Sequence, residues 1–422
     1  MPRQPLTVAL LGFGTVGSSV ARILVERPEL ADRLRLTHVF NRGVSRKRAS
    51  WLTPDVVWTE DFDEVLTARP DVVVEVVGGV EPARQWVTRA IEQGASVVSA
   101  NKMLLAAHAP ELLLAAARRG VQLRFEAAVG GGVPLIHGVR EGLSGDCLVG
   151  VAGILNGTCN YILSRMSSTG EGMDVVLADA QRLGYAEADP SADVDGHDAA
   201  AKLVVLAGIA FHRHLKASEI PTRSIRPISS ADFQYARRLG CTIRQVSQAQ
   251  TRDSGFYAKV GPVLVPQHSA FGRNEGANNI VSIFGKYGGE SSFSGAGAGG
   301  PATAVAVVSD LLALTAGGAP SETEQWRPGT IVAPAAMPYY LRFIVHDRSG
   351  ILATIAAALA KQDVNVDALL QEPGYPKDRL PFVITVEPCE EVALGAALDE
   401  IGRATWHAEA PLALPMLVGA DS

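Results

Sequence analysis

Short apolar runs alternate with amphipathic stretches over the first third of the chain, a pattern typical of strands and helices that alternate in a parallel sheet. Five of the runs predict buried strands, over residues 6–11, 36–40, 71–77, 96–99 and 121–125. Because helical periods separate the strands, we expect helices on both faces of the sheet. The first third of the chain is therefore predicted to be an open α/β domain.

The turn after the first predicted strand has the spacing of a dinucleotide-binding fingerprint. It reads Gly12-Phe13-Gly14-Thr15-Val16-Gly17 and opens an amphipathic helix that extends to about residue 25. Two glycines let the backbone approach a pyrophosphate, the third lets the helix pack on the strand, and the helix N-terminus faces the phosphates. Between a strand and a helix, the motif predicts a Rossmann domain.

The second predicted strand ends where a Rossmann domain contacts the adenosine ribose. It ends in Asn41-Arg42, with Arg46, Lys47 and Arg48 close behind, and no acidic residue stands at its tip to bind a ribose 2′-hydroxyl. Arginine suits a 2′-phosphate, so NADP is favoured over NAD. A basic loop that is only solvated is the alternative.

The next two strands also end beside residues suited to a cofactor. Gly78-Gly79 follows the strand over 71–77, and Ala100-Asn101-Lys102 follows the strand over 96–99. Open α/β sheets bind ligands at the carboxyl ends of their strands, so Lys102 is expected near the nicotinamide. A lone lysine after a strand is usually a solvated loop residue, but Lys102 follows a buried strand at the edge that binds ligands.

Two glycine-containing segments leave their role open. Residues 126–134 contain three consecutive glycines that could turn backbone carbonyls toward a cation, although turn formation explains them as well. Residues 149–160 predict a strand followed by the polar turn Asn156-Gly157-Thr158. This turn suits a small polar substrate or is an ordinary Asn-Gly turn.

Charged residues are concentrated between positions 180 and 202, in a chain with only 19% charged residues. Gly184 ends a helix and Pro190 disfavours its continuation. Residues 185–196 are therefore predicted to form a loop before a second helix that begins near His197.

Three residues at the start of that second helix are candidates for chemistry. Asp195 is placed to cap the helix, and Asp198 and Lys202 share one face, a turn apart. Lys202 stands where a solvated face meets an apolar run, a place where a lysine can lose hydration and act as an acid. A capped helix with a surface ion pair is the alternative.

Mixed α/β periodicity continues from residue 211 to the glycine run 294–301, which precedes a long apolar helix and could bring its backbone close to a cofactor or substrate. Residues 319–338, rich in Pro, Ala, Thr and Glu, predict a linker. Beyond them the pattern predicts the βαββαβ order of a ferredoxin-like module.

Length and charge limit the architecture and the partners. The 422-residue chain is too long for one core, so two or three domains are expected, and its net charge of −6 makes nucleic acid and anionic membranes poor partners. Four scattered cysteines predict reduced core residues. With no signal sequence and no apolar run of membrane-spanning length, the protein is expected to be soluble and cytoplasmic.

The charged stretch also carries a specific pattern, formed by Ala180, Gly184-Tyr185, Asp189-Pro190, Asp193-Val194-Asp195-Gly196, Asp198 and Lys202. With these residues at this spacing, the whole chain resembles the homoserine dehydrogenase family. The resemblance implies a homodimer or homotetramer whose chain has four segments. They are a NAD(P)-binding Rossmann domain over 1–135, an α+β catalytic and dimerisation domain over 136–318, a linker over 319–338 and a ferredoxin-like ACT regulatory domain over 339–422.

The resemblance also implies a reaction, the reversible reduction of L-aspartate 4-semialdehyde to L-homoserine by NAD(P)H in threonine, methionine and isoleucine biosynthesis. A lysine suits it, because the aldehyde oxygen needs a positive donor and then a proton. Lys202 matches the family's lysine in this role, and Lys102 matches a second lysine at the reacting end. Glu187 and Asp198 match carboxylates that hold the substrate ammonium group or orient Lys202. Further substrate contacts are expected from Asn156, Gly157, Thr158, Tyr185 and Asp193.

Two more sites follow from the resemblance. Backbone carbonyls of Glu126, Val129, Gly131 and Val133 match the family's structural Na⁺ or K⁺ site. The stretch Asp347-Arg348-Ser349-Gly350-Ile351-Leu352 matches an ACT loop that binds an amino acid, with L-threonine as the natural effector and Asp347, Gly350 and Ile351 as its contacts. The insertion Pro373-Gly374-Tyr375-Pro376 departs from a compact hairpin, and a module that only dimerises is the alternative.

Two other functions compete with this one. A different amino-acid oxidoreductase, such as an aspartate or diaminopimelate-type dehydrogenase, would share the nucleotide fingerprint but would not require the pattern from Asp193 to Lys202. A non-enzymatic sensor would use the nucleotide domain to report redox state and the ACT module to report an amino acid.

Overall fold

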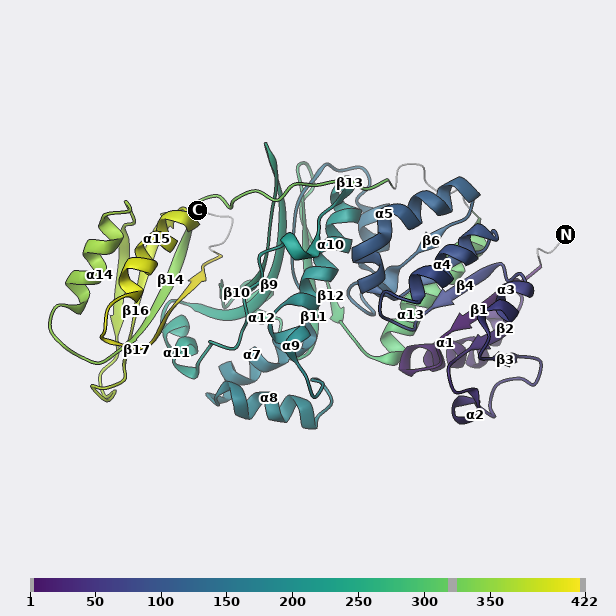
Figure 1. Ribbon diagram of the computed structural model, residues 1–422, viewed down its shortest axis with the longest axis horizontal. Coiled ribbons are helices and arrows are strands. Elements are labelled where there is room, and N and C mark those ends of the chain that lie inside the picture. The colour runs from purple at the N-terminus through teal and green to yellow at the C-terminus, as the bar shows by residue number, and fades with distance from the viewer. Residues whose placement is uncertain (1–3, 318–324, 418–422) are drawn as a thin grey trace.

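The computed structural model describes residues 4–317 and 325–417. The molecule is elongated, with an N-terminal sheet at one end, a central sheet in the middle and a small C-terminal sheet at the other end (Figure 1). The mixed α/β architecture predicted from the sequence is confirmed.

The N-terminal part is a parallel six-stranded sheet of order β3-β2-β1-β4-β5-β6. The strand order reverses between β1 and β4, which is where doubly wound sheets bind ligands. Helices cover both faces because the central strands are apolar on both. The strands are β1 (Leu6–Leu11), β2 (Leu34–Phe40), β3 (Val57–Thr59), β4 (Val72–Glu75), β5 (Ser96–Ser99) and β6 (Leu123–Arg124), and the helices are α1 (Thr15–Glu26), α2 (Val44–Lys47), α3 (Phe62–Thr67), α4 (Ala83–Glu92), α5 (Lys102–Arg119) and α6 (Leu135–His137).

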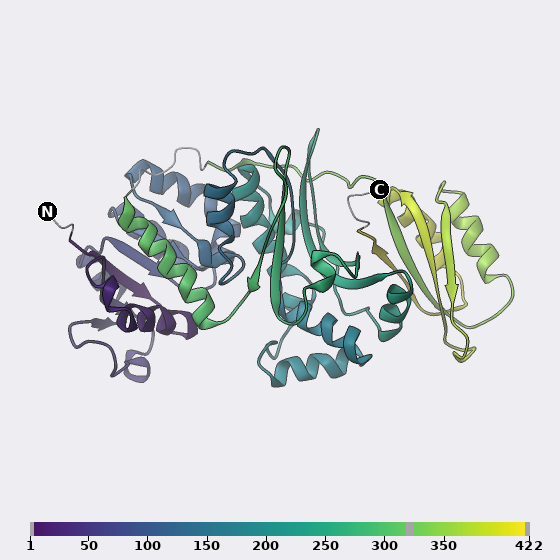
Figure 2. The ribbon, with the colours of Figure 1, turned by 180° about the vertical axis from the view of Figure 1, so that it is seen from behind.

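Helix α13 (Gly300–Ala316) returns the chain to this first sheet after the central sheet is complete, and it lies beside α1 (Figure 2). Its residues Ala304, Val307 and Leu311 share a buried core with β1 and α1. A segment from beyond residue 135 therefore completes the nucleotide domain, so the packing unit is not contiguous in sequence.

The central part is an antiparallel sheet of order β10-β9-β7-β11-β12. Helix α10 packs between this sheet and α5 of the N-terminal part, and its apolar residues are buried almost all round. The strands are β7 (Leu148–Ile154), β9 (Cys241–Arg252), β10 (Gly255–Pro266), β11 (Asn278–Gly285) and β12 (Gly289–Ala296), and the helices are α7 (Gly157–Thr169), α8 (Met173–Arg182), α9 (Ser191–Val194), α10 (His197–Phe211), α11 (Ser230–Arg238) and α12 (Ala270–Arg273).

Two local predictions in this part are wrong. Asn156 and Gly157 do not form a simple turn, because the Asn156 side chain accepts a hydrogen bond from the Cys159 backbone and starts α7. The cap expected from Asp195 is absent from α10, whose N-cap is Gly196, and the Asp195 carboxylate instead accepts a bond from Ser224. The glycine run 294–301 begins in β12 and leads into the long apolar helix α13, as predicted.

The C-terminal part has the predicted ferredoxin-like order. Strands β14 (Met337–Val345), β15 (Val366–Gln371), β16 (Leu380–Cys389) and β17 (His407–Pro415) form a sheet of order β15-β16-β14-β17, and helices α14 (Ile351–Ala360) and α15 (Glu391–Gly402) pack together beside it.

This C-terminal sheet shares a core with the central part. Tyr340 and Leu414 are buried in one cluster with Ile225 and Phe233 around α11. The Tyr340 hydroxyl donates to Asp232, and Arg342 forms a 2.5 Å ion pair with the same carboxylate; all three residues are at most 3% exposed. The small domain is therefore fixed to its neighbour by buried polar contacts.

The described end of the predicted linker, residues 325–336, lies against the central part. A short strand, β13 (Arg327–Pro328), pairs with β8 (Arg213–His214). Trp326 is 5% exposed and packs on Gly208 of α10, where a Cβ atom would lie 2.4 Å from the indole ring. This part of the segment is a packed strap.

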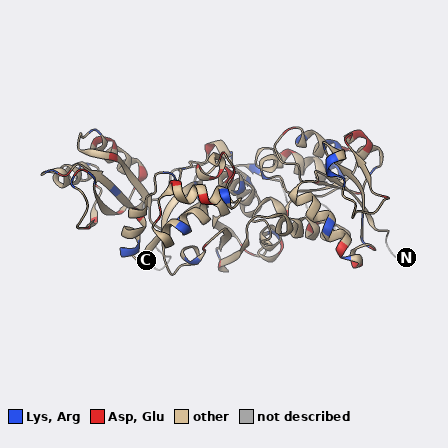
Figure 3. Cartoon of the chain, turned by 90° about the horizontal axis from the view of Figure 1, so that it is seen from below, with Lys and Arg blue, Asp and Glu red and all other residues tan. Residues whose placement is uncertain are grey.

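Acidic and basic residues are interspersed over all three parts (Figure 3), in keeping with the absence of a basic footprint in the sequence. Within 4–317 and 325–417, each helix is too short or too polar to span a bilayer.

Candidate active site

A cavity of about 570 Å³ opens where the N-terminal and central parts meet. It receives the first residue of α5, the start of α7 and one face of α10. Eight of the predicted site residues line it, together with residues 296–299, namely Lys102, Asn156, Gly157, Thr158, Tyr185, Asp193, Asp198 and Lys202. Segments far apart in sequence therefore converge on one cavity.

The Lys202 side chain is held by two acceptors. Its Nζ lies 2.8 Å from the backbone oxygen of Leu155 and 2.8 Å from Oδ2 of Asp198, one turn earlier on α10. The side chain is only 13% exposed. Because an ammonium group has three N–H bonds, two fixed partners leave one for a ligand in the cavity.

Asp198 is the centre of the charge arrangement. Its Oδ1 lies 2.9 Å from Nζ of Lys102, while Oδ2 faces Lys202. Burial alone would raise the pKa of Asp198, but the two ammonium groups outweigh burial and hold this pKa well below its usual range. Asp198 therefore stays a carboxylate and orients both lysines.

A second carboxylate, Asp193, shares a partner with Asp198. The Asn156 amide nitrogen donates to Asp193 at 2.7 Å and to Asp198 at 2.9 Å, while its oxygen caps α7. Burial raises the pKa of Asp193, and the nearby negative charge of Asp198 adds to the increase. The cavity thus has an acidic wall beside two lysines, a combination suited to a small zwitterion.

Tyr185 and Thr158 form the opposite wall. The Thr158 hydroxyl donates to the Tyr185 backbone oxygen at 2.6 Å, and the Tyr185 ring stacks on Tyr161 with 4.6 Å between centroids. Gly157 is required by a close approach, since a Cβ there would lie 2.8 Å from the Ala277 oxygen. Glu187 is exposed and, among the described residues, is not one that lines the cavity.

A second cavity of about 270 Å³ adjoins the first on the side of the parallel sheet. The two cavities share Lys102, Lys202 and the backbone of residues 297–299. The second one is also lined by Val16, Gly78, Ala100 and Asn101, which stand at the carboxyl edge of β1, β4 and β5. A ligand in each cavity would meet the other beside Lys202.

Comparison with known proteins agrees with this geometry. Residues 12–126 match the family described as homoserine dehydrogenase, NAD binding domain, residues 134–312 match homoserine dehydrogenase, and residues 339–404 match the ACT domain. Homoserine dehydrogenase from Mycobacterium tuberculosis is 43% identical over 417 residues, which cover 94% of each chain. The chain belongs to the homoserine dehydrogenase family.

Solved structures of the family have the same architecture. A homoserine dehydrogenase from Thiobacillus denitrificans matches with a TM-score of 0.90 and 34% identity over 98% of both chains. A hyperthermophilic archaeal homoserine dehydrogenase, solved in complex with NADPH, matches with a TM-score of 0.62 and 25% identity over 74% of this chain and 98% of that one. The family assignment makes the chain an oxidoreductase with a nicotinamide cofactor.

The residues of the fingerprint fit that cofactor. Gly12 has φ of +100°, and a Cβ at Gly17 would lie 2.0 Å from the Gly12 oxygen, so both positions need glycine. No side chain of the described residues caps α1 at Gly14, which leaves its first N–H groups free for a pyrophosphate. Phe13 contributes only its backbone, because its ring packs edge-on against Trp58 in the core.

The tip of β2 carries charges of both signs. Arg42 is exposed there, and the Asn41 side chain accepts a 3.2 Å hydrogen bond from the Phe13 backbone. The sequence reading missed Glu60, whose carboxylate accepts bonds from the backbones of Gly43 and Val44 at 3.1 and 2.8 Å. Glu60 follows β3, a neighbour of β2 in the sheet, so only the sheet order reveals it.

A second missed residue is Glu75, which is fully buried at the end of β4. Its carboxylate accepts bonds from the Ser99 hydroxyl and from the backbones of Val77 and Gly78. The Asn101 side chain then donates to the Gly79 oxygen at 2.6 Å. Glu75 therefore shapes the glycine turn beside the smaller cavity, and its one signal in sequence is a charge inside an apolar strand.

The segment that contains Glu126, Val129, Gly131 and Val133 lies under the shared backbone of residues 297–299. Gly130 and Gly131 have φ of +80° and +58°, which turns their peptide planes out of a regular ladder. The Glu126 side chain is engaged elsewhere, accepting bonds from Ile136 and His137. No group of three His, Cys, Asp or Glu side chains within the described ranges is placed to hold a metal, so only carbonyl oxygens could do so.

In the ACT domain, the predicted effector loop leads directly into α14. Gly350 has φ of +94° as its N-cap, and Ile351 is buried at its first position. The Asp347 backbone donates to the Lys377 oxygen at 2.6 Å, which ties this loop to the hairpin between β15 and β16.

Proposed function

We propose that the chain reduces the C4 aldehyde of L-aspartate 4-semialdehyde to L-homoserine, reversibly, with NADPH as hydride donor and Lys202 as proton donor. The observation that carries this proposal is the position of Lys202, which lines both cavities with one N–H bond unassigned. It provides a positive donor at the boundary between hydride source and substrate.

The nicotinamide supplies the hydride when it is bound in the smaller cavity. The remaining N–H bond of Lys202 donates to the aldehyde oxygen, and as C4 gains its new C–H bond the proton passes from Nζ to the developing alkoxide. The neutral amine then takes a proton from water. In the reverse direction this amine accepts the homoserine hydroxyl proton. Leu155 and Asp198 hold Nζ in place throughout, so little reorganisation is needed.

The substrate's own charges fit the larger cavity. Its ammonium group would face Asp193 and Asp198, and its carboxylate would be attracted by Lys102. Thr158 and Tyr185 would close the opposite side. Glu187 is kept as a substrate contact only if the exposed loop that carries it moves inward.

NADP is the proposed cofactor and NAD the alternative. Arg42 at the tip of β2 supports NADP because an exposed guanidinium can pair with a 2′-phosphate, and Glu60 opposes it. A monovalent cation, Na⁺ or K⁺, is proposed at the carbonyls of Glu126, Val129, Gly131 and Val133. Its role would be structural, since it would brace the loop beneath the shared cavity wall.

The protein is further proposed to be a homodimer or homotetramer. The outer strand of the central sheet, β12, supports this because most of its residues are exposed. Light scattering on the purified protein measures the mass directly, and a monomer at micromolar concentration would contradict the proposal.

Feedback by L-threonine through the ACT domain is also proposed. The start of α14, at Gly350 and Ile351, offers backbone N–H groups to an effector's carboxylate, and Asp347 offers a partner for its ammonium group. The ACT family match supports an amino-acid effector.

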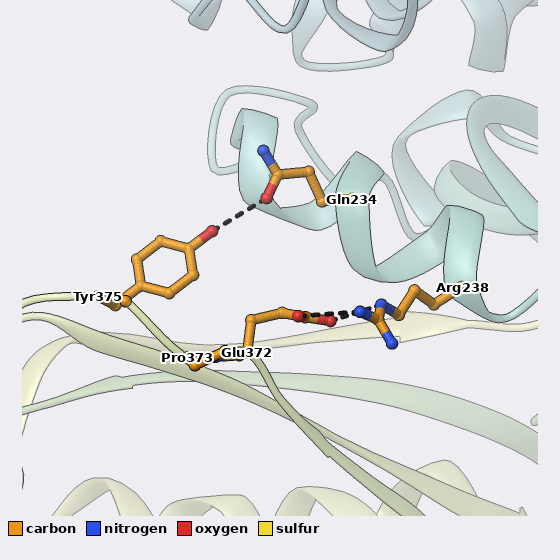
Figure 4. A pocket seen from close by; sticks show the side chains of 6 residues that line it. Gln234, Arg238, Glu372, Pro373 and Tyr375 are labelled. Atoms are coloured by element: carbon orange, nitrogen blue, oxygen red, sulfur yellow. Dashed lines mark hydrogen bonds and ion pairs between the residues drawn. The ribbon is translucent and has the colours of Figure 1, made fainter.

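A chain of contacts supports a route from this loop to the active site. Asp347 contacts the β15–β16 hairpin at Lys377. Figure 4 shows the other side of the hairpin, where Glu372 forms a two-fold ion pair with Arg238 and the Tyr375 hydroxyl donates to Gln234 of α11. The insertion at 373–376 is thus a clasp on the central part.

From α11 the contacts continue toward the substrate. The segment before the helix is bound to the acidic loop, because the Ile225 backbone donates to the Val194 oxygen and Ser224 donates to Asp195. Asp193 immediately precedes Val194 in the chain and lines the cavity. Movement of the clasp can therefore reach the substrate carboxylates through α11.

Two assays test the proposal. Purified protein with L-homoserine and NADP⁺ should generate absorbance at the wavelength of reduced nicotinamide. The absence of this absorbance with both NADP⁺ and NAD⁺ would contradict the proposed reaction. For regulation, Glu372→Gln should weaken inhibition by threonine without changing turnover in the absence of threonine. Glu219→Gln, a substitution of an exposed residue, is the control. Equal inhibition of the two variants would refute the clasp route.

A further inference from the structure

Asn279 is a buried amide beside the active site that no step above uses. It lies near the start of β11, between β7 and β12 in the central sheet, and is 1% exposed. Its Nδ2 lies 3.3 Å from the backbone oxygen of Leu155. That oxygen can only accept a hydrogen bond, which assigns the amide nitrogen to this side.

The same Leu155 oxygen accepts from Lys202 at 2.8 Å. Asn279 and Lys202 therefore share one acceptor, and the direction of the Leu155 carbonyl determines where Nζ is held. A carbonyl bonded only by Lys202 could rotate with its peptide plane, whereas a second donor from a rigid strand fixes that plane.

The other side of the amide supports the shared wall of the two cavities. A Cβ on Gly297 would lie between 2.1 and 2.4 Å from the Asn279 amide atoms, so the backbone at 297 lies directly against them. Gly131 also packs against the Gly297 oxygen, since a Cβ on Gly131 would lie 2.5 Å from it. The Gly132 backbone N–H donates a hydrogen bond to the Ala296 oxygen. The wall is held between these two supports.

Half of the amide's bonding capacity is unused, since Oδ1 of Asn279 has no hydrogen-bond partner among the described residues. A buried polar atom without a partner costs stability. An apolar residue of similar size would avoid this cost, so the amide is explained by its contacts with Leu155 and Gly297.

We propose that Asn279 is a positioning residue for the reduction: it fixes the Leu155 carbonyl so that Lys202 keeps one N–H bond directed at the substrate oxygen. The inference rests on the proposed role of Lys202 as proton donor. It concerns orientation, so Asn279 itself gains and loses no proton.

The test uses the full chain and two substitutions. Asn279→Ala removes the donor, and kcat for aldehyde reduction should fall about tenfold while NADPH affinity, measured by fluorescence titration, stays within about twofold. Asn279→Asp keeps the volume but brings a carboxylate within about 6 Å of the ammonium group, close enough to favour its protonated form. The alkaline limb of the pH profile of kcat should then move up by about one unit.

Asn160 provides a matched control. It is also a fully buried asparagine whose Oδ1 has no hydrogen-bond partner in 4–317 or 325–417. Its Nδ2 donates to the backbone oxygens of Asn274 and of Asn278, the residue before Asn279. Asn160→Asp introduces the same charge into the same region without touching Leu155. Its pH profile should coincide with that of the parent.

The possible results distinguish a failure of the positioning role from a failure of the proposed function. An unshifted pH profile in Asn279→Asp, or an equal shift in Asn160→Asp, overturns the positioning role. If Asn279→Ala does not fold, Asn279→Asp alone still decides. Failure of the proposed function gives a different result, because Lys202→Ala would then retain turnover whatever the Asn279 variants do.

Discussion

Lys102, at the start of α5, and Lys202, in the second turn of α10, bind the two oxygens of one carboxylate, with their Nζ atoms 2.9 and 2.8 Å from Asp198. Lys102 is the first residue of α5, which packs against α10. The charge arrangement consequently exists only while the nucleotide and catalytic parts are docked. A shift between them would change the field at the substrate before any side chain changed its rotamer.

Replacing Lys202 tests the proton donor. Lys202→Ala should lower kcat about 10²- to 10⁴-fold, because the alkoxide loses both its positive partner and its proton. NADPH binding, followed by fluorescence, should change little. Lys216→Ala, which removes an exposed lysine paired with Glu219, serves as the control. Turnover above a tenth of the parent in Lys202→Ala would remove Lys202 from the mechanism.

Neutralising Asp198 tests the electrostatics. At pH 7, Asp198→Asn should destabilise the protein by about 3 kcal/mol, because two lysines lose a buried partner. The pKa of Asp198 is held low in the folded state. The contribution of Asp198 to the free energy of unfolding is therefore complete above about pH 4, the ordinary pKa of aspartate, and is lost as the pH falls further. Urea unfolding of parent and variant should therefore differ most at neutral pH and converge in acid. A gap that widens in acid would show the opposite sign of coupling.

Cofactor choice is predicted to depend on two residues of opposite charge. Arg42→Ala should raise the KM for NADPH about tenfold and leave that for NADH unchanged, because only NADPH carries the 2′-phosphate. Glu60→Gln should have the opposite effect and lower the KM for NADPH relative to that for NADH, because it removes a nearby negative charge. Lys47→Ala, from the same basic loop, controls for loss of general positive charge. Equal effects of Lys47→Ala and Arg42→Ala would mean that the loop is only solvated.

The ACT interface should be structural as well as regulatory. Arg342→Ala leaves Asp232 buried without its cation and should cost about 3–5 kcal/mol in urea unfolding. Arg379→Ala breaks an exposed ion pair with Glu409 and should cost less than about 1 kcal/mol. A small effect of Arg342→Ala would mean that the domain is only tethered.

Local sequence signals identified the elements whose causes are local. The glycine fingerprint, the end of α8 at Gly184 and the βαββαβ order depend on neighbouring residues, and all were predictable. Asn156-Gly157 was ambiguous for a physical reason. The same side-chain oxygen that closes a turn also caps a helix, and only packing of the following residues selects α7.

Long-range features had no sequence signal. The return of α13 to the first sheet depends on a surface left uncovered by residues 300 positions earlier in the chain. Glu60 and Asn279 act through sheet neighbours, which the strand order alone brings to the site. The charged pattern from Asp193 to Lys202 was found because its spacing is short, whereas its partner Leu155 contributes only a backbone atom.

The packing of the Trp326 ring on Gly208 has a consequence for exchanging domains between relatives. Gly208 lies on the same helix as Asp198 and Lys202, so the indole ring packs on the element that carries the proposed proton donor. A graft that begins at β14 leaves this ring on its own helix, whereas a graft that includes Trp326 places the ring on a foreign helix. The exchangeable unit therefore begins after Trp326, unless the recipient offers a glycine at the position of Gly208.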